Sequence, residues 1–264
     1  MFNCIRRSRL LLVCLFLSHP SFAGSFSVNP INLVFDASTK TASLKVTNED
    51  TNKVTVQLEA KAWAQDIKSG DLYSDSPDLI FFPKIIEIDG GSERLIRVGY
   101  MGSPANDREK TYRLFVQELP VIKPGETTMK FAIRMGIPVF VHVKTPKKVP
   151  MIDDAVLNNS VVRVTMGNNG NSHYVVDKIL ARGMDTKGDT VFTHDVSGWY
   201  VLAGQQHVFE VTIPSGECTK ASSVAIEVTV DKKTLSKTIN VSAALCDSKS
   251  KSSPLRTVEK IKEK

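Results

Sequence analysis

Short segments in which apolar and polar residues alternate constrain the fold of this chain more than any other feature of its sequence. Alternation with a period of two residues is typical of β-strands whose two faces meet different surroundings. Such segments recur along most of the chain, are separated by turn residues such as Gly, Asn, Asp and Pro, and show no helical periodicity. The sequence therefore predicts an all-β protein built from β-sandwiches.

The clearest alternation lies in residues 128–142, which predict a strand. One face of this strand carries four bulky apolar side chains, those of Met129, Phe131, Ile133 and Met135. The opposite face carries the cations Lys130 and Arg134. Methionine is unbranched and adaptable, so two of them on one face suit a surface that accepts varied partners. Two interpretations stand: the strand pairs with another protein, or it is an ordinary sandwich strand whose apolar face meets its own core.

Other segments predict breaks in the pattern. Residues 26–35 form a strand that Pro30 either places at a sheet edge or interrupts, because proline cannot donate a backbone hydrogen bond. Residues 66–78 are polar and predict a loop. The aromatic Phe82 before Pro83 raises the chance of a cis peptide bond, and the sequence leaves this isomer open.

The first 23 residues have the pattern of a secretory signal peptide. A basic start with three Arg is followed by an apolar run over residues 10–17 and by small residues at Ser21 and Ala23. We expect cleavage after Ala23. The apolar run is far shorter than the roughly 20 residues that a membrane-spanning helix needs, so we expect export without membrane insertion.

Net charge argues against a nucleic-acid partner. The formal charge is +6 for the whole chain and falls to about +3 without the predicted leader, which carries three Arg and no acid. The remaining basic residues gather in residues 144–148 and after Lys249, where we expect a solvated linker and tail. A stripe of basic and aromatic residues, which would indicate nucleic-acid binding, is absent from the sequence.

The strand pattern stops at a short segment with two prolines and then starts again, which predicts two domains. The chain of 264 residues is long enough for both to bury a core. The predicted parts are a signal peptide (1–23), an N-terminal immunoglobulin-like domain (24–143), a linker (144–150), a C-terminal immunoglobulin-like domain (151–247) and a disordered tail (248–264).

Two of the four cysteines remain after the predicted cleavage, Cys218 and Cys246. An even pair in an exported chain predicts a disulfide, which the loop-entropy argument values at roughly 3–4 kcal/mol for a loop of this size. Neither cysteine lies in a C-x-x-C motif, and no histidine stands at a ligand spacing from another, so the sequence predicts no metal site.

Motifs of catalysis are missing from the sequence. It has no G-x-S-x-G, no phosphate-binding loop and no zinc-ligand spacing. The histidines of the predicted mature chain are isolated from one another: His142, His173, His194 and His207. We therefore expect no enzyme, no catalytic residues and no cofactor.

Several segments together resemble the periplasmic pilus-assembly chaperones of the chaperone–usher pathway, the PapD-like family. Their shared order and spacing carry the resemblance more than any one of them does. The segments are residues 32–36, 44–48, 60–63, 82–83, 89–91, 95–98, 112–115, 118–120, 137–140 and 168–171 with Tyr174.

The resemblance implies two immunoglobulin-like domains in an L-shaped arrangement and a mechanism called donor-strand complementation. In that mechanism the chaperone inserts alternating apolar residues of its seventh strand into a pilin subunit that lacks a strand, and then delivers the subunit to an outer-membrane usher. The matching positions here are Met129, Phe131, Ile133 and Met135. The implied location is the periplasm, and no nucleotide is implied. Whether the free form caps itself by dimerising is left open.

The chain departs from the family at the site that anchors the subunit's terminal carboxylate. The family's Arg and Lys are matched by Asn32 and Pro138, and this departure resembles the branch called archaic or alternative. We expect Arg113 and Arg134 to replace the pair, since a carboxylate needs charge-assisted donors; alternatively, both are ordinary exposed charges of a sheet.

A second difference concerns the family's interdomain ion pair. Glu109 matches its acid, whereas His142 stands at the position of its arginine. The resemblance therefore implies that the two domains are held together differently here.

A secreted two-domain sandwich that binds a ligand, such as an adhesin or carbohydrate module, is the alternative function. Adhesin modules more often show exposed aromatic residues in loops, whereas the aromatic residues here lie mainly within predicted strands. The sequence does not name the bound subunit or the face that meets the usher.

Overall fold

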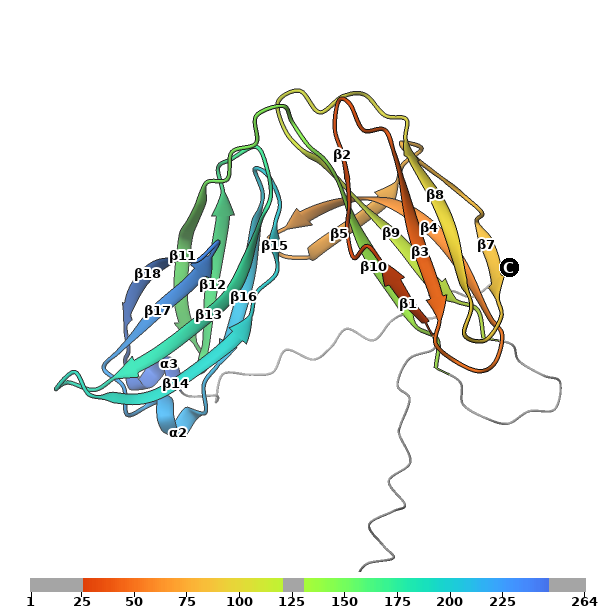
Figure 1. Ribbon diagram of the computed structural model, residues 1–264. Helices are drawn as coiled ribbons and strands as arrows, with labels where there is room; N and C mark the ends of the chain where they lie inside the picture. Colours follow the sequence, from red (N-terminus) through yellow and green to blue (C-terminus); the bar gives the residue numbers. More distant parts are fainter. Residues whose placement is uncertain (1–25, 121–130, 247–264) are drawn as a thin grey trace, which may run out of the picture.

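The computed structural model describes residues 26–120 and 131–246, and they form two β-sandwiches (Figure 1). The two sandwiches meet at an angle, like the arms of an L. The predicted all-β fold with two immunoglobulin-like domains is therefore confirmed. The predicted leader and tail lie outside the described residues, as does Met129. In the part of the chain that the structure describes, no helix has the length and apolar character to cross a membrane.

The first domain has two sheets. One sheet has the order β1 (Phe26–Asn29), β3 (Thr41–Asn48), β8 (Glu93–Tyr100) and β6 (Leu79–Phe82). The other has the order β2 (Leu33–Phe35), β10 (Arg134–Val141), β9 (Lys110–Glu118), β4 (Val54–Asp66) and β5 (Gly70–Asp75), with β7 (Ile85–Ile88) also paired to β4.

Alternating residues of these strands build the core between the two sheets. On β4, Val54, Val56 and Leu58 are buried, and on β3 Leu44 and Val46 are fully buried. Each such side chain contributes about 1.5–3 kcal/mol on burial. The register of every strand is thereby fixed, because a shift by one residue would turn its apolar side chains toward solvent.

The predicted break at Pro30 is present, and it moves the chain from one sheet to the other. β1 pairs antiparallel with β3, whereas β2, just after Pro30, pairs parallel with β10. Both Asn29–Pro30 and Phe82–Pro83 are cis, which answers the question that the sequence left open for Phe82–Pro83.

The predicted loop over residues 66–78 is wrong, because it contains β5. This strand forms a hairpin with β4, in which Trp63 pairs with Tyr73 and Gln65 with Asp71. Its side chains are largely exposed, so the segment lacks the apolar alternation that marks strands over a core.

The second domain also has two sheets. The smaller has the order β11 (Pro150–Asn158), β12 (Val161–Asn168) and β16 (Gln206–Thr212). The larger has the order β14 (Thr190–Ser197), β13 (Tyr174–Met184), β17 (Ser223–Val230) and β18 (Lys233–Asn240), with β15 (Tyr200–Val201) also paired to β13.

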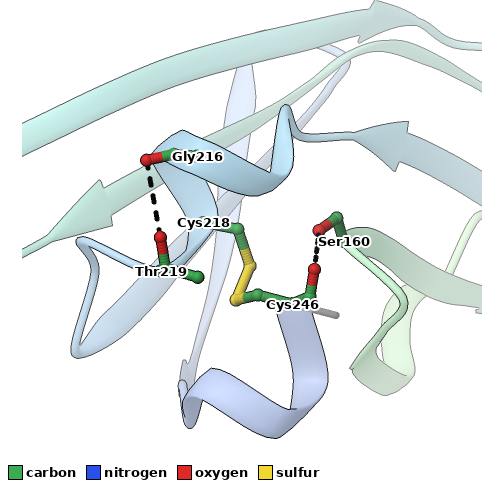
Figure 2. Close-up of a disulfide and its surroundings, with 5 residues drawn as sticks. All are labelled: Ser160, Gly216, Cys218, Thr219 and Cys246. Atoms are coloured by element: carbon green, nitrogen blue, oxygen red, sulfur yellow. Dashed lines mark hydrogen bonds between the residues drawn. A yellow bond between two sulfur atoms is a disulfide. The ribbon is translucent and has the colours of Figure 1, made fainter. Parts of the chain in front are cut away.

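The predicted disulfide is confirmed and joins two short helices at one end of the second domain (Figure 2). Cys218 ends α2 (Ser215–Cys218) and Cys246 ends α3 (Ala243–Cys246). Both cysteines are buried in the core of this domain. Ser160 Oγ donates a hydrogen bond of 2.7 Å to Cys246 O, which fixes the end of the described chain to the loop before β12.

Replacing both cysteines with Ala tests the contribution of this link. The two residues are 28 positions apart, so the loop-entropy argument predicts that the free energy of unfolding falls by about 3–4 kcal/mol. Urea denaturation followed by circular dichroism measures the loss. Wild-type protein reduced with dithiothreitol is the matched comparison, and an unchanged unfolding midpoint in both would contradict the prediction.

Candidate functional site

The outer face of the sheet that contains β10 looks away from the core of the first domain. On β9, Leu114 and Val116 point into that core, so Arg113 and Phe115 lie on the opposite, outer face. The register places Arg113 beside Pro138 of β10, Phe115 beside Gly136, and Gln117 beside Arg134. Both predicted anchors, Arg113 and Arg134, therefore share this face.

One edge of β10 is open along most of its length. β9 pairs with β10 from Arg134 to Val141, whereas on the other side β2 pairs only with Val139, Phe140 and Val141. Among the described residues, no strand pairs with residues 134–138 on that side. An unpaired edge offers its backbone donors and acceptors to another strand.

Of the predicted strand over residues 128–142, residues 128–130 lie outside the described residues, and in the described part β10 begins at Arg134. One further hydrogen bond extends the ladder, from Glu118 N to Ile133 O at 2.9 Å. In the same register Phe131 would face Pro120, which has no backbone N–H to donate. The ladder with β9 therefore ends there.

The described members of the predicted apolar face differ in exposure. Phe131 is 84% exposed. Ile133 and Met135 are partly buried and pack against the rim of the domain's own core. On this face, Phe131 is therefore exposed to solvent, whereas Ile133 and Met135 pack against the core of the domain.

Arg113 is the most unusual side chain of the outer face because it is a buried cation. It is 4% exposed. Its guanidinium lies 3.8 Å from the ring centre of Trp63, with Trp199 and Tyr200 of the second domain at 5.1 and 5.5 Å. Aromatic faces attract a cation and are less costly neighbours for it than aliphatic groups.

The hydrogen-bonding capacity of Arg113 is mostly unused. Nη1 donates to Gly136 O at 3.0 Å, while Nε and Nη2 have no partner among the described residues. Burial lowers the pKa of Arg113, and Tyr73 and Asp71 oppose that shift. Arginine still stays protonated. Arg113 therefore presents a positive charge with free donors in a place where water is scarce, an arrangement that favours an anion.

Gly136 makes room for this arrangement. A Cβ at this position would lie 3.1 Å from Phe115 Cε1 and 3.7 Å from Arg113 Cδ. The first of these contacts is unusually short for a packed interior, and the second is an ordinary contact. The missing side chain lets Phe115 and Arg113 lie against the backbone of β10.

Arg134 has a different environment. Its guanidinium lies over Phe115 at 3.8 Å, and Nη2 is 3.0 Å from Glu59 Oε2. The side chain is 46% exposed, as is that of Glu59, so the pair is worth at most about 1 kcal/mol. The structure thus brings both predicted anchors to one face, with Phe115 between them, and leaves free donors on Arg113.

The second domain closes the site from the other side. Gln65 Nε2 donates to Tyr200 O at 2.9 Å, and Gln65 Oε1 accepts from Leu202 N at 2.9 Å. Trp199 Nε1 donates to Asp71 Oδ2 at 3.0 Å. The β4–β5 hairpin therefore positions the aromatic residues of the second domain over Arg113.

The profile of one family, described as "Pili and flagellar-assembly chaperone, PapD N-terminal domain", matches residues 25–149. This range covers the first domain and the strands that build the site. The first domain therefore belongs to the PapD-like chaperone family.

Solved structures show the same two-domain PapD-like fold. One is a chain of the CsuC–CsuE chaperone–tip adhesion subunit pre-assembly complex from archaic chaperone–usher Csu pili of Acinetobacter baumannii; it is 20% identical, with 81% of this chain and 98% of that chain covered and a TM-score of 0.58. Another is the YadV chaperone, 14% identical, with 83% and 100% covered and a TM-score of 0.54. No curated protein sequence matches the chain.

The positions of the usual PapD-like anchor pair hold unsuitable residues. Asn32 is exposed and uncharged, and Pro138 is buried and has no side-chain donor. The nearest charged donor to Pro138 in the ladder is Arg113, which is its direct partner on β9. The missing charge is therefore present on the adjacent strand.

Several residues around Arg113 were not predicted as site residues. Trp63, Gln65, Trp199 and Tyr200 come from separate parts of the chain and meet only when the domains pack together. No local spacing signals that meeting. A Trp at the end of a long alternating strand, as at Trp63, is the one hint that the sequence contains.

Replacing Arg113 with Met tests whether this cation stabilises the fold. Methionine has a similar length and leaves no buried N–H unpaired, so we expect the free energy of unfolding to stay within about 1 kcal/mol of wild type or to rise. Urea denaturation measures it. The control is Leu114→Ala on the core face, which should cost about 2–5 kcal/mol; equal losses in the two variants would show that Arg113 is structural.

Proposed function

We propose that this PapD-like protein is a non-enzymatic periplasmic chaperone that binds pilus subunits by donor-strand complementation and delivers them to an outer-membrane usher. The observation that carries the proposal is the open edge of β10 over residues 134–138, beside the exposed Phe131. The family membership of the first domain supports the chaperone role.

In this proposal, the backbone of the open β10 edge supplies affinity for the subunit, and the apolar side chains of the same strand supply selectivity. A strand added beside β10 gains main-chain hydrogen bonds, and alternate side chains enter its pockets. Phe131 offers the largest exposed apolar surface, with Ile133 and Met135 next along the same face and Met129 expected to continue it. Each side chain buried in a subunit contributes roughly 1.5–3 kcal/mol before the cost of ordering.

Arg113 is the proposed anchor for the terminal carboxylate of the bound subunit. It has two donor nitrogens without partners and is the ladder partner of Pro138, at the end of the open edge. Both nitrogens are buried, so a carboxylate reaches them when the covering Trp199 side chain moves aside. Arg134 is the second candidate, and Glu59 competes for it. An anchor on β9 in place of the usual pair also favours assignment to the archaic or alternative branch.

The Phe131→Asp substitution tests the donor strand. A charge on this exposed side chain should leave the domain folded and reduce capture of a subunit at least about 10-fold, because a buried unpaired carboxylate is costly. The measurement is the amount of complex purified after co-expression with a candidate pilus subunit.

The matched control is Leu95→Asp, on β8 of the other sheet, where the side chain is 64% exposed. This variant should capture the subunit as the wild type does. Full capture by Phe131→Asp, or an equal loss in both variants, would count against the donor-strand proposal.

Replacing Arg113 and Arg134 together with Ala tests the anchor. We expect the double variant to lose capture at least about 10-fold, since a charge-assisted hydrogen bond is worth about 1.5–3 kcal/mol, while each single variant reports its own share. Co-purification of subunit from periplasmic extracts is the measurement. Arg163→Ala, which removes an exposed ion pair with Glu210 in the second domain, is the control. Normal capture by the double variant would remove both residues from the site.

A further inference from the structure

Two histidines and one glutamate meet at the junction of the two domains, outside the site on β10. Glu109 directly precedes β9, His142 directly follows β10, and His173 directly precedes β13 of the second domain. One donor atom of each lies within 4.8 Å of the others. The three side chains thus start from the ends of regular strands, which hold them more precisely than free loops would.

Glu109 is at the centre of this cluster. Its side chain is fully buried, with Oε1 at 3.2 Å from His142 Nε2 and Oε2 at 2.6 Å from His173 Nδ1. Oε2 also accepts a hydrogen bond from the backbone N of His173 at 2.8 Å, and Glu109 N donates to Asn171 O at 2.9 Å. The carboxylate is therefore held against the second domain.

The ring of His173 and the backbone of His142 are also held in place. The ring of His173 stacks on Phe140 with a centroid distance of 3.7 Å and an interplanar angle of 11°. The backbone N of His142 donates to Phe35 O at 2.8 Å, which continues the ladder between β10 and β2. Rings and backbone fixed in this way lose little freedom when they bind a ligand.

Two imidazole nitrogens and a carboxylate oxygen are a zinc ligand set that leaves a fourth position for water. Ligand atoms about 2.0–2.1 Å from a tetrahedral zinc lie roughly 3.3 Å apart. Oε1 and His142 Nε2 already have nearly this separation, and Oε2 would need to move away from His173 Nδ1 by under about 1 Å. All three donor atoms lie within 4.8 Å of one another, so side-chain shifts of about 1–1.5 Å would bring them to the spacing of a tetrahedral ion.

The cluster can be reached from solvent on the side of His142. The His142 side chain is 34% exposed and borders an open hollow with both polar and apolar walls, among them Asp36, Ser38 and Asn106. The hollow gives an ion access to the His142 ring, behind which the buried Glu109 lies. Lys40 and Lys144 line the same hollow, so we expect weaker binding than at structural zinc sites with four protein ligands.

We propose that Glu109, His142 and His173 form a binding site for a divalent zinc-like ion that links the two domains. Two ligands come from the first domain and one from the second, so a bound ion fixes the angle between them. Without the ion, the hydrogen bonds of Glu109 to the second domain perform the same task more weakly. The inference is independent of the proposed capture of subunits.

Calorimetric titration of the EDTA-treated protein, purified without a histidine tag, with ZnCl₂ tests the proposal. We expect one zinc per chain, no heat with MgCl₂, and with CoCl₂ the visible absorption of a four-coordinate ion. His173→Ala and His142→Ala should each weaken zinc binding at least about 10-fold. His194→Ala is the control, because His194 pairs with Glu217 at 2.7 Å without a third ligand among the described residues, and it should bind as the wild type does.

A second substitution distinguishes a loss of zinc binding from a loss of the fold. His142→Arg offers Glu109 a cationic donor but has no lone pair for a metal. We expect it to keep the wild-type circular dichroism spectrum, to lose zinc binding, and to lose the rise in unfolding temperature that zinc gives the wild type. Absence of zinc uptake by the wild type, unchanged affinity in His142→Arg, or a loss in His194→Ala would overturn the site.

Discussion

The unequal pairing of β10 is the constraint on which the site depends. One edge is satisfied over the whole strand by β9, while the other meets β2 at only three residues. This inequality follows from Pro30, because the first strand of the chain is divided and only its second, short half reaches this sheet. A longer β2 would close this edge, and residues 134–138 would then have no unpaired backbone groups on that side.

After the unpaired edge of β10, the buried charge of Arg113 is the second feature that is unfavourable for the stability of the fold. A charge kept from water with two unpaired N–H groups is unfavourable, and stacking on Trp63 offsets only part of that. The structure around it is nevertheless well built: Gly136 makes room, Gln65 ties the hairpin to the second domain, and Trp199 covers the outside. Careful support of an unfavourable group is typical of a functional site.

Much of the fold could be predicted from the sequence because the core is encoded by alternation. The buried faces of β3 and β4 follow directly from it, and the pairing of Cys218 with Cys246 follows from export and an even count. β5 was missed because it covers no core of its own domain, so its residues carry no apolar alternation. The described residues 131–133 fall outside β10, because Pro120, just after β9, has no N–H to continue the ladder.

The site was less predictable than the fold for a related reason. The face shared by Arg113 and Arg134 could be predicted from resemblance, but which of them has free donors depends on Glu59 and on the second domain. The meeting of His142 and His173 at Glu109 joins residues from three distant positions. Such meetings are set by the packing of two domains, and no local pattern of residues records them.

The position of the short β2 also limits how much of β10 another strand can pair with. It runs parallel to β10 and begins opposite Val139, so any guest strand lying along residues 134–138 in the same direction must stop there, after about 17 Å. Its last residue would then arrive next to Pro138, one strand away from the guanidinium of Arg113. The start of β2 therefore sets the length of the β10 edge that is open to the proposed partner strand.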